Sequence, residues 1–303
     1  MEIVIAGGTG FIGHALVSVL SREHRALVLS RDAGKVRAGQ PLIWNPGDAG
    51  AWRTDVARAD VIINLAGASI GEGRWTAGRR RQILESRVRA TEALTSAVKD
   101  GTRRDQTFIS ASAIGHYGSR GEEILDESSG RGTDFLAEVT QAWEAGAETI
   151  GDLARLVILR FGMVLAGDGG ALPQLARPMI WFAGGRIGDG RQWMSWVDRG
   201  DLIRAVQWTI GNARSRGIYN VTAPNPVRNS EFIRTLASVL HRPALFPAPA
   251  PLLRIALGKD KADALLLASQ RVLPRRLLQD GFEFQFPELQ TALERAFGRS
   301  PRI

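Results

Sequence analysis

The sequence contains no cysteine and no long apolar run. A membrane-spanning helix needs roughly 18 or more consecutive apolar residues, so we expect no transmembrane segment. The lack of Cys excludes disulfides, thiolate catalysis and cysteine-based metal sites. The chain begins directly with the strand-like MEIVIA and without a basic leader, which predicts a cytoplasmic protein with no signal peptide. Four isolated histidines give no metal-binding spacing, and we expect no metal: His14, His24, His116 and His241.

The chain has fewer acidic than basic residues. The formal net charge is +8 and the isoelectric point about 10.8, values that also occur in nucleic-acid-binding proteins. The arginines are scattered, however, with short runs such as Arg79–Arg81 and Arg275–Arg276, and no basic tail accompanies them. We therefore expect an anionic small ligand rather than a nucleic acid.

Apolar runs that suit strands alternate with longer helical stretches in the first half of the chain. This alternation predicts an α/β fold with a Rossmann-type, doubly wound parallel sheet. We place this domain at residues 1–165, with later segments able to return to it, and a smaller C-terminal α/β subdomain on the substrate side at 166–303. The expected strands are Glu2–Ala6, Arg25–Ser30, Leu42–Trp44, Val61–Ala66, Thr107–Ser110 and Leu156–Arg160. The expected helices are Gly13–Arg22, Thr76–Lys99, Phe135–Asp152, Asp201–Asn212 and Leu289–Phe297, with Thr76 and Asp201 as N-caps.

A glycine-rich turn follows the first expected strand. The segment AGGTGFIG places three glycines between that strand and an apolar-periodic helix. Glycines let the backbone turn tightly and approach a pyrophosphate, whose charge then lies at the helix N-terminus. The strand before the motif and the helix after it are the context that a dinucleotide site requires. The predicted contacts are Gly7, Thr9, Gly10, Phe11, Ile12 and Gly13.

The end of the second strand predicts which dinucleotide binds. NAD-specific folds place an Asp or Glu there, and its carboxylate binds the ribose 2′-hydroxyl. Here Ser30 and Arg31 occupy that place, and Asp32 comes one residue later. Serine can hydrogen-bond a 2′-phosphate, and arginine can pair with it. We therefore predict NADP(H), although a shift of one residue in this alignment would return Asp32 to consideration.

Several motifs make the chain resemble the extended short-chain dehydrogenase/reductase superfamily. Within it, the chain is most similar to an atypical, YfcH-type branch of the NAD-dependent epimerase/dehydratase-like proteins, some of whose members are called cell-division-inhibitor-like. The resemblance implies a family-specific C-terminal segment of unassigned role at about residues 250–298. The matching stretches are AGGTGFIG (6–13), NLAGASIGEGRW (64–75), ESRVRAT (85–91), SASAIGHYG (110–118), DFLAEV (134–139), LRFGMVLAGDGGAL (159–172), GDGRQWMSWV (188–197) and RVLPRRLLQDGFEFQFPEL (271–289).

The resemblance implies further cofactor contacts. In the superfamily, a segment like NLAG lies along the adenine ribose and the pyrophosphate, so this wall would be formed by Leu65, Ala66 and Gly67. Arg87 stands where relatives carry a cofactor-side Asn, and it can face a phosphate, a substrate carboxylate or solvent. The nicotinamide end would involve Ser110, Arg160 and Gly162, although Arg160 can equally belong to a buried ion pair.

The resemblance also reveals a loss. Enzymes of the superfamily move the substrate proton with a Tyr that is assisted by a Lys four residues later. The matching positions here hold Phe135 and Val139. The only tyrosines are Tyr117 and Tyr219, and no lysine lies between residues 100 and 258. The usual pair is therefore absent.

Three side chains near the expected nicotinamide end are candidates to replace that pair. Ser112 matches the family's active-site Ser, and His116 and Tyr117 follow it. A histidine suits acid-base chemistry near neutral pH, and a tyrosine can donate to a carbonyl oxygen. Both can instead be structural, since a tyrosine in a YG turn commonly packs and His116 can be exposed.

By resemblance to extended family members, two loops are expected to lie over the substrate, one at residues 73–75 and the other at residues 184–201. Aromatic rings offer stacking surface and arginines recognise anions. The alternative is that Trp193 and Trp196 only cap a core. The predicted substrate contacts are Arg74, Trp75, Gln192, Trp193 and Trp196.

These observations predict an NADP-dependent oxidoreductase or epimerase acting on an unidentified small molecule, of carbonyl or sugar-nucleotide-like type, with altered acid-base groups. The alternative is a non-catalytic NADP(H) sensor that acts through a protein partner, which the loss of Tyr and Lys favours. We expect neither a nucleic acid nor a membrane as partner. A homodimer is compatible with the sequence.

Overall fold

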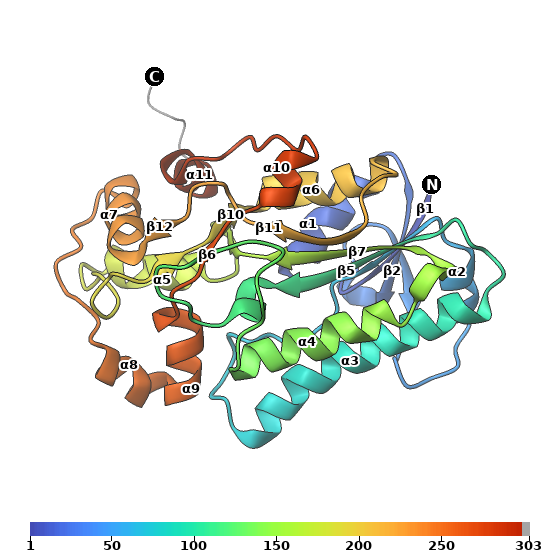
Figure 1. Cartoon of the computed structure of the whole chain (residues 1–303), viewed down its shortest axis with the longest axis horizontal. Coiled ribbons are helices and arrows are strands. Elements are labelled where there is room, and N and C mark those ends of the chain that lie inside the picture. Colours follow the sequence, from blue (N-terminus) through green and yellow to red (C-terminus); the bar gives the residue numbers. More distant parts are fainter. Residues whose placement is uncertain (299–303) are drawn as a thin grey trace.

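A parallel sheet of seven strands organises the computed structural model, which describes residues 1–298 (Figure 1). The strand order is β3-β2-β1-β4-β5-β7-β11. Its first six strands have the Rossmann order, which confirms the predicted fold class. The strand β11 comes from beyond residue 165, so a later segment does return to the sheet. The bounds are β1 (Glu2–Ala6), β2 (Arg25–Ser30), β3 (Gln40–Ile43), β4 (Val61–Asn64), β5 (Thr107–Ala113), β7 (Arg155–Phe161) and β11 (Gly217–Val221).

Helices cover both faces of this sheet, which explains why its strands are almost continuously apolar. One face packs against α1 (Phe11–Leu20) and α6 (Arg199–Gly211). The other packs against α2 (Trp52–Arg58), α3 (Ala77–Asp100) and the end of α4 (Phe135–Glu148). The long helices α3 and α4 lie side by side below the sheet in Figure 1.

A second core forms around Trp196 beyond one end of the sheet. It joins α5 (Leu172–Ile180), α7 (Asn229–Leu240) and α11 (Leu289–Ala296). Short paired strands frame it: β8 (Met163–Leu165) with β10 (Trp196–Asp198), β9 (Trp193–Met194) with β12 (Val227–Arg228), and β6 (Ile124–Leu125) with β13 (Arg271–Val272). The remaining helices are α8 (Ala250–Leu257), α9 (Lys259–Ala262) and α10 (Arg275–Gln279).

The predicted elements are all present, with shifted ends. The strand expected to stop at Ser110 continues to Ala113, and the helix expected to reach Asp152 ends at Glu148, before a 3-10 turn at Gly151–Leu153. Thr76 caps α3 as predicted, since its side chain accepts a hydrogen bond from the backbone N–H of Arg79. Over residues 1–298, no helix is both long and apolar enough to cross a membrane.

The prediction that Asp201 is a helix cap was wrong. Asp198 caps α6 instead, accepting from the backbone N–H groups of Gly200 and Asp201. The fully buried Asp201 carboxylate accepts from the N–H groups of Gln285 at 2.9 Å and Phe286 at 2.8 Å. Its position in the first helical turn therefore lets it hold the C-terminal segment against α6.

Replacing Asp201 by Ala should lower the free energy of unfolding. The substitution leaves the two N–H groups without their acceptor, and an unsatisfied buried donor costs about 1–3 kcal/mol, so we expect a loss of about 2–4 kcal/mol. Urea unfolding followed by tryptophan fluorescence measures this loss. The control Asp152→Ala removes a fully exposed carboxylate and should change the free energy by less than about 0.5 kcal/mol. Equal stability of both variants would contradict the assigned role of Asp201.

Candidate functional site

The carboxyl ends of the central strands meet at one edge of the sheet. The parallel register places Ala6 beside Asn64, Asn64 beside Ser110, and Ser112 beside Arg160. Ligands of open α/β sheets bind outside this edge. The predicted residues Ser110 and Arg160 are thereby brought to the same edge as the loops after β1 and β4, which begin with Gly7 and Leu65.

The glycine-rich turn between β1 and α1 has the close packing that a dinucleotide site needs. Gly7 has a φ of +80°, and a Cβ there would lie 2.6 Å from the backbone of Leu65. A Cβ on Gly13 would lie 2.1 Å from the carbonyl oxygen of Gly7. The N-cap Gly10 makes no side-chain cap, and the first turn of α1 carries no acidic residue. The positive end of α1 is therefore suited to a pyrophosphate.

The opposite wall is the loop after β4. Buried Asn64 shapes this loop, because its amide donates to the Thr91 hydroxyl at 2.8 Å and its carbonyl accepts from the N–H of Ala66. Arg87 lies beneath the loop and donates to the carbonyl oxygen of Ala68 at 3.0 Å. Burial, with a smaller contribution from neighbouring Arg79, lowers the pKa of Arg87 to about 10. Arg87 thus supports the loop that carries the predicted cofactor wall of Leu65, Ala66 and Gly67.

At the end of β2, Arg31 makes no ion pair or side-chain hydrogen bond among residues 1–298. The Ser30 hydroxyl is used internally, since it donates to the carbonyl oxygen of Asp32 at 2.7 Å and accepts from the Asp32 N–H. The Asp32 carboxylate accepts from the N–H of Gly34. Exposed Arg31 instead lines a cavity of about 240 Å³ whose other walls are Ile43, Trp44, Asn45, Asp48, Gly50 and Trp52. Arg31 is therefore better placed than Ser30 to reach a bound group.

A buried ion pair between Arg160 of β7 and Glu144 of α4 lies at the ends of β5 and β7. The guanidinium of Arg160 donates to both carboxylate oxygens of Glu144, at 2.8 and 2.7 Å. The Ser112 hydroxyl also donates to this carboxylate, at 2.5 Å. The Tyr117 hydroxyl accepts from Arg160 at 3.0 Å and donates to Asn220 at 2.7 Å. We call Ser112, Tyr117, Glu144, Arg160 and Asn220 the buried network.

This placement is at odds with direct roles for Ser112 and Tyr117 in catalysis. Both hydroxyl protons are donated to protein acceptors, and the two side chains are 2% and 0% exposed. Arg160 likewise lies in the buried ion pair that was the alternative to a cofactor contact. Sequence reasoning missed Glu144, although a carboxylate on the buried face of α4, seven residues after Ala137, was a signal that it must have a buried cationic partner.

His116 is the remaining catalytic candidate. It is 9% exposed, its ring contacts Tyr117 edge-on, and its Nδ1 lies 3.7 Å from Glu144. Among the described residues, this buried Nδ1 has no hydrogen-bond partner. Burial and the positive charge of Arg160 outweigh the attraction of Glu144 and lower the pKa of His116 to about 4. The imidazole is therefore neutral at pH 7.

An aromatic wall stands where the superfamily Tyr is missing. The Phe135 ring meets Trp75 edge-on at 5.2 Å and lies under the Arg80 guanidinium at 4.4 Å. Val139, at the lysine position, is buried. The site therefore offers an aromatic surface and an arginine in place of the phenol and the ammonium.

The C-terminal segment holds the loop that carries this wall. Buried Lys261 of α9 donates to the carbonyl oxygens of Gly71 at 2.6 Å and Gly73 at 2.7 Å. Arg74 donates to the carbonyl oxygens of Ile255 and Ala256 on α8. Arg80 pairs with Asp260 at 2.9 Å. Figure 1 shows α8 and α9 at the lower left, beyond the end of α3 that carries Arg80.

The other predicted substrate residues are held by protein contacts. Trp196 is fully buried at the centre of the second core, which matches the alternative that it caps a core. The buried Gln192 amide donates to the carbonyl oxygens of Ile187 and Leu266. Half-buried Trp193 is contacted by the guanidinium groups of Arg228 and Arg271, each 4.4 Å from its ring, and donates to Glu122. The polar atoms of Gln192 and Trp193 are thus engaged within the protein, whereas the buried indole nitrogen of Trp196 has no hydrogen-bond partner among residues 1–298. In this structure the three residues support the loop, and a substrate contact by them stays a prediction.

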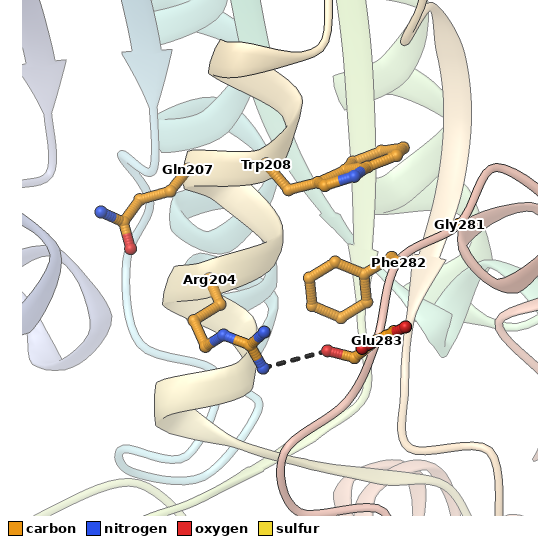
Figure 2. Close-up of a pocket in the computed structure, with 6 residues that line it drawn as sticks. All are labelled: Arg204, Gln207, Trp208, Gly281, Phe282 and Glu283. Carbon is orange, nitrogen blue, oxygen red and sulfur yellow. Dashed lines mark hydrogen bonds between the residues drawn. The ribbon is translucent and has the colours of Figure 1, made fainter.

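A larger cavity, of about 460 Å³, lies between α6 and the segment 281–283. Figure 2 shows Arg204 and Trp208 facing Phe282 across it, with Arg204 donating to the carbonyl oxygen of Glu283. None of the predicted cofactor or substrate residues lines this cavity. Its lining residues are Arg204, Gln207, Trp208, Gly281, Phe282 and Glu283.

The lowered pKa of His116 predicts a pH-dependent stability. The folded pKa of about 4 lies below the unfolded value of 6.5, so the unfolded chain takes up the proton first. The stabilising contribution is complete above pH about 6.5 and is lost as the pH falls toward 4, by about 3 kcal/mol in total. Comparing urea unfolding of wild type and His116→Asn between pH 4 and 7 isolates this contribution. The slopes should differ, and identical slopes for wild type and His116→Asn would contradict the burial argument.

Lys261→Met should loosen the loop at residues 70–75. The change removes the donor that holds two carbonyl oxygens while keeping most of the side-chain volume. Hydrogen exchange measured by mass spectrometry should speed up about tenfold in that loop. The control is Lys259→Met in the same helix, because exposed Lys259 makes no ion pair or side-chain hydrogen bond within residues 1–298. Unchanged exchange in Lys261→Met would mean that Arg74 and Arg80 hold the loop without it.

Two family models match this chain. The NAD dependent epimerase/dehydratase family matches residues 3–138, which include the glycine turn, the β4 loop and the start of α4. A domain of unknown function, DUF1731, matches residues 248–296, which include Asp260 and Lys261. The contacts between α9 and the loop at 71–73 therefore join the two matched regions.

Similar proteins cover the whole chain. It is 38% identical over 297 residues to the epimerase family protein YfhF of Bacillus subtilis, with 97% of each chain covered. It is 36% identical over 300 residues to the chloroplastic epimerase family protein SDR39U1 homolog of Arabidopsis thaliana, covering 97% of this chain and 86% of that protein. The crystal structure of the human epimerase family protein SDR39U1 (isoform 2) with NADPH has a TM-score of 0.89 at 30% identity, covering 99% of this chain and 100% of that chain. The chain therefore belongs to the NAD dependent epimerase/dehydratase family.

Proposed function

We propose that this protein binds NADP(H) and acts as an oxidoreductase or epimerase on a small carbonyl or sugar-nucleotide-like substrate. The observation that carries the proposal is the packing of the glycine turn against the β4 loop. A Cβ at Gly7 would fill the space against that loop, and a Cβ at Gly13 would fill the space against the backbone of Gly7, so the backbone is kept close enough to cradle a pyrophosphate. NADPH in the structure of the human relative supports the same cofactor here.

The end of β2 favours NADP(H) over NAD(H). The free guanidinium of Arg31 can pair with a 2′-phosphate. The Asp32 carboxylate, the alternative contact for a ribose 2′-hydroxyl, accepts from the N–H of Gly34 and lies 4.0 Å from the Lys35 ammonium. Trp44 and Trp52, with ring centroids 5.7 Å apart, line the same cavity as Arg31.

The chemistry has to proceed without the Tyr and Lys pair. When bound, the reduced nicotinamide supplies a hydride. Arg80, which covers the Phe135 ring, is the charged group at the vacated Tyr position, and it would stabilise negative charge on a substrate oxygen or bind a substrate anion. The Phe135 and Trp75 rings would orient the substrate and exclude water. The buried network would act as a positioning device, since Glu144 ties α4, which begins at Phe135, to the ends of β5 and β7.

A second candidate function is a non-catalytic NADP(H) sensor. The observation that favours it is the engagement of both candidate hydroxyls, Ser112 and Tyr117, inside the buried network. A sensor needs no proton donor, only a surface that differs with and without nucleotide. In that case a partner protein would be captured with NADPH and not without it, and no panel of carbonyl substrates would oxidise NADPH.

Arg31→Ala tests the cofactor proposal. Loss of a charge-assisted contact to the 2′-phosphate should weaken NADPH binding about tenfold to a hundredfold, because a hydrogen bond to a charged group contributes about 1.5–3 kcal/mol. Calorimetric titration with NADPH and with NADH measures both affinities, and NADH binding should stay unchanged. Arg22→Ala, at the far end of α1, is the matched control.

Two results would contradict the proposal. If wild type binds neither dinucleotide, the glycine turn serves only as scaffold. If Arg31→Ala weakens the binding of NADPH and of NADH equally, the guanidinium does not contact the 2′-phosphate. Once binding is established, oxidation of NADPH by a carbonyl and sugar-nucleotide panel separates the enzyme from the sensor.

A further inference from the structure

Large apolar side chains are exposed in two neighbouring segments. Among residues 1–298, eleven large hydrophobic side chains are exposed, and seven of them belong to these segments. The most exposed is Trp181, at 75%. None of the residues of α8 is buried, although its sequence APLLRIAL is almost wholly apolar. We call these seven residues the apolar face: Ile180, Trp181, Phe182, Leu245, Phe246, Leu252 and Ile255.

The two segments form one surface. The N–H of Phe246 donates to the carbonyl oxygen of Gly184 at 3.1 Å, and the N–H of Ala248 donates to that of Arg186 at 2.8 Å. The Arg242 guanidinium lies 4.9 Å from the Phe182 ring. In Figure 1 the chain between α7 and α8 runs along the left side of the molecule, and α8 lies below it. A contiguous apolar surface of this kind marks an interaction site.

The same segments carry charge of one sign. Residues 169–188 and 232–259 contain no Asp or Glu. Of their cations, Arg254 pairs with Asp263 at 2.7 Å; the others form no ion pair within the described part of the chain. The two segments are therefore positively charged as well as apolar. Its cations are Arg177, Arg186, Arg234, Arg242, Arg254 and Lys259.

We propose that the apolar face binds the surface of an anionic phospholipid membrane. Amphipathic segments with Trp, Phe and Leu beside Arg and Lys lie in the interface plane, with apolar groups among the acyl chains and cations at the phosphates. Trp181 and the exposed helix α8 supply the apolar groups, and the arginines and Lys259 of the same segments supply the cations. A second copy of the chain fits less well, because a two-fold contact would bring unpaired cations against the same cations.

Sedimentation of the full-length protein with vesicles tests this proposal. Binding to vesicles of phosphatidylcholine and phosphatidylglycerol should exceed binding to phosphatidylcholine alone at least about tenfold, and added salt should weaken it. Trp181→Ser with Leu252→Ser should lower the binding about tenfold or more, because the apolar insertion is lost. The matched control, Ile124→Ser with Leu278→Ser, removes two exposed apolar residues elsewhere and should bind like wild type.

Three outcomes would overturn the proposal. The first is no preference for anionic vesicles in the wild-type protein. The second is that the Trp181→Ser, Leu252→Ser variant still binds anionic vesicles and that the protein binds soluble polyglutamate equally well. This result would identify the face as a site for acidic macromolecules. The third is a dimer in sedimentation velocity that the same variant dissociates, which would make the face a contact between two copies of this chain.

Discussion

The ion pair between Arg160 and Glu144 is the constraint on which the candidate site depends. The two side chains are 3% and 7% exposed, and removing either partner would leave a charge in a buried setting, which costs about 3–5 kcal/mol. Their remaining hydrogen-bonding capacity is met by Ser112 and Tyr117. This requirement draws both hydroxyls away from the open edge of the sheet. The carboxylate thereby joins α4 to the ends of two strands and sets the direction in which α4 begins at Phe135.

A second constraint arises because the aromatic wall at Phe135 is held from far along the chain. The loop at 71–75 carries Trp75 and is exposed at residues 71–74, so its shape depends on donors that reach its carbonyl oxygens. Lys261 supplies them from a position 190 and 188 residues away. The region that matches the domain of unknown function therefore holds one wall of the proposed substrate side.

The sequence predicts the features that depend on local patterns. Hydrophobic runs locate all six strands that we expected, and the glycine spacing locates the turn after β1, because both follow from neighbouring residues alone. Contacts between residues that are far apart in the sequence could not be predicted from it. Glu144 and Lys261 find their partners through the topology, and Trp196 and Gln192 face inward because a second core forms around the loop that we expected to cover substrate. The Asp201 cap failed for the same reason, since a distant segment competes for its carboxylate and Asp198 caps α6.

The apolar face, too, could be predicted from the sequence only in part. The two segments without Asp or Glu are visible in the sequence, and so is the apolar helix that begins at Ala250. The expectation of no membrane partner rested on the lack of a spanning run, and a surface contact needs no such run. What only the structure provides is that α8 leaves its apolar side chains uncovered while its carbonyl oxygens accept from Arg74. Because Arg74 adjoins Trp75, the apolar face lies next to the loop of the proposed substrate side. A membrane bound there would approach the loop that Lys261 holds.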